Sequence, residues 1–134
     1  MQKYNPLILV VVTTTGTGWV EPSSVGSFEV LTGGDSATVS MQYSYLPSWL
    51  SFLVDQERAR EAGRQLYDAV YERWVRLPAD DRPQLYVFGE SLGAHTSQDA
   101  FLDTGTQGLQ DAGVERALWI GTPHLSKWKK QVMA

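Results

Sequence analysis

Short apolar runs alternate with longer amphipathic stretches along the chain, an order typical of parallel strands joined by crossover helices. Residues 7–13 are almost continuously apolar and predict a buried strand, because parallel strands covered on both faces lack polar alternation. Residues 37–43, 85–88 and 117–120 predict three further strands. We therefore expect an α/β fold whose mostly parallel sheet has about four strands with flanking helices.

The stretches between these strands have patterns that predict helices. A short helix is expected to open at Ser23 or Ser24, just after a proline. From about residue 55 to residue 77, apolar positions recur at steps of three and four, which predicts one long amphipathic helix. A second helix is predicted over residues 92 to about 104, with Gly105 as a left-handed cap.

The last third of the chain carries weaker signals. Residues 108–116 read as a polar connector. In residues 125–133, three apolar side chains share one helical face and lysines lie elsewhere: Leu125, Trp128 and Val132. Such a helix also suits a membrane surface, although a segment this short buries little area there.

The composition of the chain excludes several classes of function. The 134 residues suffice for one domain, and a formal net charge of −4 without a basic stripe argues against a nucleic-acid partner. Cysteine is absent and histidine occurs twice, so neither a metal nor an organic cofactor is predicted. The most apolar run, residues 6–12, is far shorter than the ~20 residues of a membrane helix. No small-residue cleavage site follows it, so neither a transmembrane segment nor a signal peptide is expected.

One pentapeptide carries chemistry: Gly89-Glu90-Ser91-Leu92-Gly93, a G-x-S-x-G motif. It lies between a predicted strand and a predicted helix, the setting of a nucleophile elbow. In such a turn the serine is strained and exposed, and glycines let the following helix pack closely. Ser91 is therefore the candidate nucleophile. The alternative is a structural Gly-Ser turn that merely opens a helix.

A serine nucleophile needs donors for the oxyanion that forms during acyl transfer. The backbone N–H of Leu92, directly after the serine, is one candidate. The second is expected in the glycine-rich loop after the first strand, at Thr17 or Gly18. The alternative is a glycine turn chosen for its shape alone.

Three segments resemble a known family: residues 15–20, 41–49 and 85–93. They are similar to the catalytic domain of the actinobacterial α/β-hydrolase family of membrane proteins, whose substrate is not established. The resemblance implies that Ser91 is the nucleophile and that the full-length protein is membrane-associated. It also implies that the first strand here is the third strand of a hydrolase sheet.

In that fold the acid and the histidine of the triad follow the serine on later strands. Only fourteen residues remain after Ile120, so residues 1–134 are interpreted as a single, truncated hydrolase domain. His95, one helical turn after the serine, is expected to pack beneath the elbow. His124 follows a strand end and is the better candidate for the site. Glu90 and Trp19 are further candidates to line it.

The leading interpretation is a serine hydrolase of the esterase or lipase type that acts on a small-molecule or lipid-like ester. The alternative is a catalytically inactive hydrolase-fold fragment that lacks the acid and base. Because strands outside residues 117–120 are missing in this interpretation, that edge is also expected to drive self-association.

Overall fold

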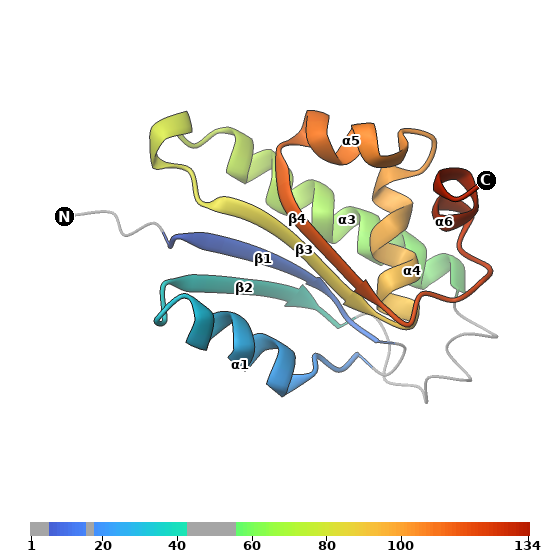
Figure 1. The fold of residues 1–134 in the computed structure, drawn as a ribbon, viewed down its shortest axis with the longest axis horizontal. Coiled ribbons are helices and arrows are strands. Elements are labelled where there is room, and N and C mark those ends of the chain that lie inside the picture. Colours follow the sequence, from blue (N-terminus) through green and yellow to red (C-terminus); the bar gives the residue numbers. More distant parts are fainter. Residues whose placement is uncertain (1–5, 16–17, 43–55) are drawn as a thin grey trace.

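A four-stranded parallel sheet forms the centre of the computed structural model, which describes residues 6–15, 18–42 and 56–134 (Figure 1). The strands are β1 (Ile8–Thr13), β2 (Ser36–Met41), β3 (Gln84–Glu90) and β4 (Val114–Ile120). Their order across the sheet is β2-β1-β3-β4, and each neighbouring pair is parallel. The predicted α/β class and all four predicted strands are confirmed, with bounds that differ by one to three residues.

Helices cover both faces of the sheet (Figure 1). Helix α1 (Pro22–Leu31) lies on one face, and α3 (Gln56–Val75) and α4 (Leu92–Gln98) lie on the other. Two shorter helices, α5 (Gly105–Ala112) and α6 (Lys127–Val132), lie on the side of α3 and α4. The remaining elements are two 3₁₀ turns, η1 (Ala79–Asp81) and η2 (Asp99–Phe101).

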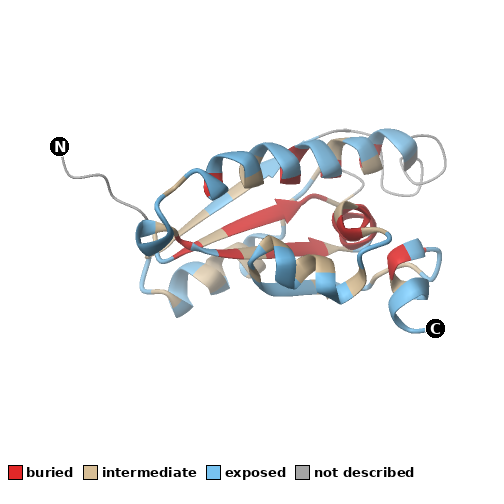
Figure 2. Ribbon diagram, turned by 90° about the horizontal axis from the view of Figure 1, so that it is seen from above, coloured by how far each residue is buried: buried red, intermediate tan, exposed pale blue. Residues whose placement is uncertain are grey.

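Strand β1 shows why its sequence is continuously apolar. Val10 and Val12 pack with Phe88 on the α1 side, whereas Val11 packs with Leu66 on the α3 side. Both faces of the strand are therefore buried, as Figure 2 shows for the central strands. The hydrophobic effect acts on every side chain of the run rather than on alternate ones.

The region after α4 differs from its prediction. The expected helix over residues 92–104 ends at Gln98, passes through η2 and gives way to α5. Gly105 does have a positive φ of 60°, but it begins α5 instead of capping the preceding helix. Asp103, at φ 68°, makes the break, and Gln131 of α6 holds it through two hydrogen bonds of 2.8 and 3.0 Å. The predicted polar connector over residues 108–116 is wrong, because it contains the greater part of α5 and the start of β4.

Helix α6 buries one aromatic side chain against the sheet. Trp128 is 8% exposed and meets Trp119 edge to face, with ring centroids 4.9 Å apart. Leu125 and Val132 remain largely exposed. The interpretation of this segment as a membrane-surface helix is wrong for Trp128, because its indole is buried in the hydrophobic core and does not face outward. In the described part of the chain, no helix combines the length and the apolar character needed to cross a bilayer.

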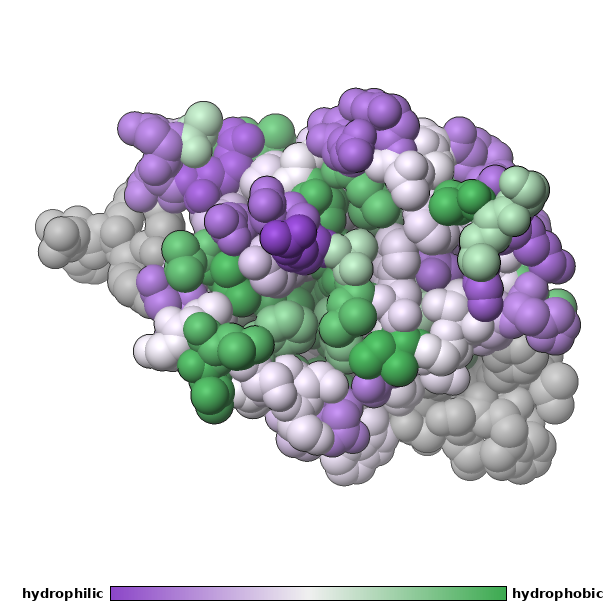
Figure 3. Space-filling model, in the orientation of Figure 1, coloured by the Kyte–Doolittle hydropathy of each residue, from purple (hydrophilic) through white to green (hydrophobic). Residues whose placement is uncertain are grey.

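Strand β4 is an edge strand within the described residues. Leu118 and Ile120 are 49% and 47% exposed on the side that faces α1. Figure 3 shows apolar surface gathered over this face of the sheet. The outer backbone of β4 has no partner strand among the described residues, as expected for residues 117–120.

Candidate active site

Ser91 occupies a sharp turn between β3 and α4. Its backbone has φ 53° and ψ −119°, and only one other described non-glycine residue, Asp103, has a positive φ. Such a conformation typically costs about 1–3 kcal/mol and persists only where the surroundings impose it. Two hydrogen bonds do so here. The Ser91 N–H donates to the carbonyl of Ile120 at 2.9 Å, and the Ser91 carbonyl accepts from the His95 N–H at 3.2 Å.

The two glycines of the motif are fixed by backbone packing. A Cβ at Gly89 would lie 2.6 Å from the carbonyl oxygen of Gly93. A Cβ at Gly93 would collide with the carbonyl oxygens of Thr13 and Thr14, at the end of β1. Helix α4 can therefore start this close to β1 and β3 only without side chains at both positions. The predicted reason for the glycines is confirmed.

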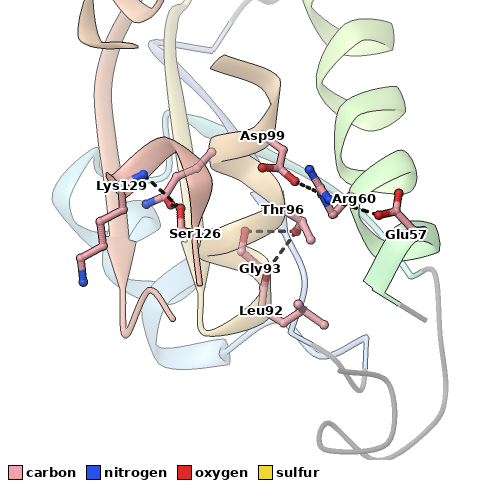
Figure 4. Close-up of polar contacts among 9 residues, drawn as sticks. Glu57, Arg60, Leu92, Gly93, Thr96, Asp99, Ser126 and Lys129 are labelled. Atoms are coloured by element: carbon pink, nitrogen blue, oxygen red, sulfur yellow. Dashed lines mark hydrogen bonds and ion pairs between the residues drawn. The ribbon is translucent and has the colours of Figure 1, made fainter. Parts of the chain in front are cut away.

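The Thr96 side chain stabilises the first turn of α4, and the Ser91 side chain is not needed for this purpose. The Thr96 hydroxyl donates to the carbonyls of Leu92 and Gly93, at 3.0 and 3.3 Å (Figure 4). The Ser91 side chain is solvent-exposed and makes no capping hydrogen bond to the helix. Its Oγ is therefore open to a molecule that approaches the sheet edge. The Leu92 N–H lies at the start of the helix, where backbone donors lack intrahelical partners.

The loop after β1 lies beside this turn, because the Thr13 and Thr14 carbonyls meet Gly93. Thr17, one candidate oxyanion donor, lies outside the described residues. Gly18, the other, has φ 81°, and its N–H donates to the Thr15 carbonyl at 2.9 Å. In this conformation the Gly18 donor is therefore used within the loop itself.

His95 lies beneath the elbow, as predicted, and is 6% exposed. Burial lowers the pKa of its imidazole, and the neighbouring carboxylate of Asp99 opposes this shift only in part. Arg60 and Lys127, also nearby, lower the His95 pKa further. Asp99 itself forms a buried ion pair with Arg60 of α3 (Figure 4). The uncharged form of the ring is therefore favoured, and the ring packs beneath the elbow one helical turn after Ser91.

The other candidate residues are Glu90, His124 and Trp19. Glu90 is half-buried at the end of β3. His124 is exposed and lines a shallow pocket of about 300 Å³ with residues of α6. Trp19 is 68% exposed. No hydrogen bond or ion pair in the described part of the chain joins any of the three to Ser91. The described residues also contain no group of three or more metal-binding side chains.

A buried polar cluster further along α4 was not predicted from the sequence. Ser97 accepts a hydrogen bond from the Trp119 indole at 3.0 Å. Gln98 donates to Thr122 at 3.1 Å and accepts from Ser126 at 2.5 Å. The signal in the sequence was a run of four polar residues, 96–99, in the predicted helix, and such a run by itself does not identify partners.

A parallel α/β sheet with a strained serine between a central strand and a buried helix is the arrangement of an α/β hydrolase. The family model described as the alpha/beta-hydrolase family matches residues 2–134, and the chain belongs to this family.

A solved structure of an acetylxylan esterase has a similar fold, with a TM-score of 0.60 and 18% sequence identity. The match covers 90% of this chain but 65% of the esterase, so the chain spans less than two thirds of that structure. A comparison with curated proteins finds no significant match.

Proposed function

We propose that the chain is a serine hydrolase of the esterase type and that Ser91 is its nucleophile. The observation that carries the proposal is the strained backbone of Ser91 in a member of a hydrolase family. A turn that needed only a positive φ would be served better by glycine. The strain is retained together with an exposed hydroxyl, which favours a role for that hydroxyl.

In this mechanism Ser91 Oγ attacks the carbonyl carbon of an ester, and its proton passes to a general base. The oxyanion of the tetrahedral intermediate accepts a hydrogen bond from the Leu92 N–H and from a second donor in the loop after β1, with Thr17 and Gly18 as candidates. The Gly18 N–H would first have to leave the Thr15 carbonyl. Collapse of the intermediate releases the alcohol, which takes up the proton, and leaves an acyl-serine. Water then hydrolyses the acyl-serine and restores the enzyme.

A second candidate function is supported by the positions of the histidines. His95 is buried under the elbow, and His124 makes no hydrogen bond to Ser91. Without a base, a serine hydroxyl is a weak nucleophile. This arrangement favours the alternative in which the chain keeps the hydrolase fold but performs no turnover.

Hydrolysis of p-nitrophenyl acetate separates the two candidates. The acetyl ester is chosen because the structural neighbour is an acetylxylan esterase. We expect hydrolysis above the buffer rate by the wild-type chain, its loss in Ser91→Ala, and its retention in Ser97→Ala, a buried serine of the same helix. Equal rates above the buffer rate in wild type and Ser91→Ala would refute Ser91 as the nucleophile, whereas a wild-type rate equal to the buffer rate would favour the inactive alternative.

The resemblance to actinobacterial membrane proteins leads to one further proposal, that the full-length protein works beside a membrane. It rests on the three similar sequence segments and not on a membrane-spanning helix among the described residues. A lipid-like ester would then be a suitable substrate. Fractionation of cells that express the full-length protein tests it, because recovery wholly in the soluble fraction would contradict it.

A further inference from the structure

The segment of residues 121–126, here called the β4–α6 loop, starts directly against the elbow. The residue before it, Ile120, accepts the Ser91 N–H at 2.9 Å. Gly121 has φ 62°, and a Cβ there would lie 4.0 Å from the Ser91 nitrogen. The first residue of the loop therefore packs against the backbone of the proposed nucleophile.

The carboxamide of Gln98 binds the rest of the loop through both its nitrogen and its oxygen. Its Nε2 donates to Thr122 Oγ1 at 3.1 Å, and its Oε1 accepts from Ser126 Oγ at 2.5 Å. Gln98 is 3% exposed and Ser126 is fully buried. A side chain with a donor and an acceptor at one end matches these two hydroxyl partners.

The same loop end is tied to α6. Ser126 Oγ also accepts the Lys129 N–H at 3.2 Å and so caps the helix (Figure 4). Loss of the Gln98 amide would leave the Ser126 hydroxyl without its acceptor in a buried place, which is unfavourable. Through Gln98 and Ser126, the loop is therefore bonded to both α4 and α6.

Helix α4 connects Gln98 to the elbow. Ser91 is the N-cap residue of this helix, and Gln98 is its last residue. The helix therefore begins at the serine and holds the β4–α6 loop at its other end, through Gln98. His124 lies in this loop between Thr122 and Ser126, the two residues that Gln98 binds.

We propose that Gln98 is a positioning residue, which holds the β4–α6 loop against the Ser91 elbow and so keeps the serine in its reactive conformation. This inference rests on the proposed function of Ser91. Gln98 does not touch the reacting atoms; it acts through Thr122, Ser126 and the loop that they belong to.

The test compares three variants of the full chain. Gln98→Met keeps the length of the side chain and removes both loop contacts. Thr122→Val removes one of them from the partly exposed loop and remains informative if Gln98→Met fails to fold. Ser97→Ala is the matched control, because Ser97 is equally buried and bonds to Trp119 of β4 rather than to the loop.

Two quantities are measured at equal fractions of folded protein. The first is hydrogen–deuterium exchange of the amides in residues 121–126, and the second is the rate constant for labelling of Ser91 by a fluorophosphonate. For Gln98→Met we expect loop exchange about tenfold faster and labelling about tenfold slower, the size expected for loss of a buried hydrogen-bonded group. Thr122→Val shifts both in the same direction by about threefold. Ser97→Ala leaves both within about twofold of wild type.

The outcomes separate the inference from the function beneath it. Unchanged loop exchange in both Gln98→Met and Thr122→Val shows that Gln98 does not hold the β4–α6 loop and overturns the inference. Faster loop exchange with an unchanged labelling rate shows that Gln98 is structural only and overturns its positioning role. Absence of labelling in the wild-type chain refutes the proposed function of Ser91, whatever the loop exchange shows.

Discussion

Two tight turns follow the two central strands at the same edge of the sheet, and they meet their backbone requirements differently. After β1, a glycine supplies the positive φ, with Gly18 at 81°. After β3, a serine adopts φ 53°, although glycine would adopt it without strain. In the first turn the positive φ falls on a residue that adopts it without strain, whereas the second turn keeps a strained side chain exposed. The chain therefore retains a hydroxyl at position 91 although serine disfavours this backbone conformation.

The largest effect is expected from the glycine that lets α4 approach β1. Gly93→Ala places a Cβ against two rigid carbonyl oxygens and is expected to lower the free energy of unfolding by about 3 kcal/mol. The control is Gly26→Ala in α1, where a Cβ meets nothing within 4 Å. It is expected to raise the free energy of unfolding by about 0.5–1 kcal/mol. Urea unfolding checks both, and a Gly93→Ala chain as stable as wild type would contradict the packing described for the elbow.

Substitutions at position 91 and position 18 measure how much strain each turn carries. Ser91→Gly is expected to be about 1 kcal/mol more stable than Ser91→Ala, because glycine relieves the strain. Gly18→Ala is expected to lose about 1 kcal/mol, since alanine must adopt a positive φ there. Both Ser91 variants lose the proposed hydrolysis. Equal stability of Ser91→Gly and Ser91→Ala in denaturant unfolding would mean that position 91 is unstrained.

The free energy of unfolding is expected to depend on pH through His95, which is buried in α4. The His95 pKa is lowered in the folded state, so the unfolded chain binds more protons once the pH falls below the ordinary value of about 6.5. The contribution of His95 to stability is thus present above that pH and is lost as the pH falls. In His95→Gln, the decline of the free energy of unfolding between pH 7 and pH 5 becomes shallower. The same decline in both proteins would assign it to other groups.

A substitution at the outer edge of β4 is expected to have the smallest effect on stability. We propose that this chain self-associates there, because Leu118 and Ile120 are exposed beside a backbone without a partner strand among the described residues. Leu118→Lys is expected to reduce association while leaving the unfolding midpoint almost unchanged. Size-exclusion chromatography with light scattering measures it. A stable wild-type monomer of 14.9 kDa at tens of micromolar, where exposed edges commonly associate, would exclude this pairing.

The sequence predicted the sheet well because burial on both faces leaves an unmistakable apolar run, as in β1. It also located the elbow, since two glycines around Ser91 have a steric reason that depends only on nearby strands. Helix α5 was missed because one exposed side makes its sequence as polar as a loop. The Gln98 contacts were missed for another reason: they join residues 24 and 28 positions apart, and no periodicity records such a pair.

The most direct test of the account is the site at which a fluorophosphonate reacts. Peptide mapping by mass spectrometry of the labelled wild-type chain is expected to find the adduct on Ser91, with none on Ser97 and none anywhere in Ser91→Ala. Such an adduct requires a serine that is both exposed and activated. An unlabelled wild-type chain, or an adduct on another residue, would contradict the assignment of Ser91 as the nucleophile.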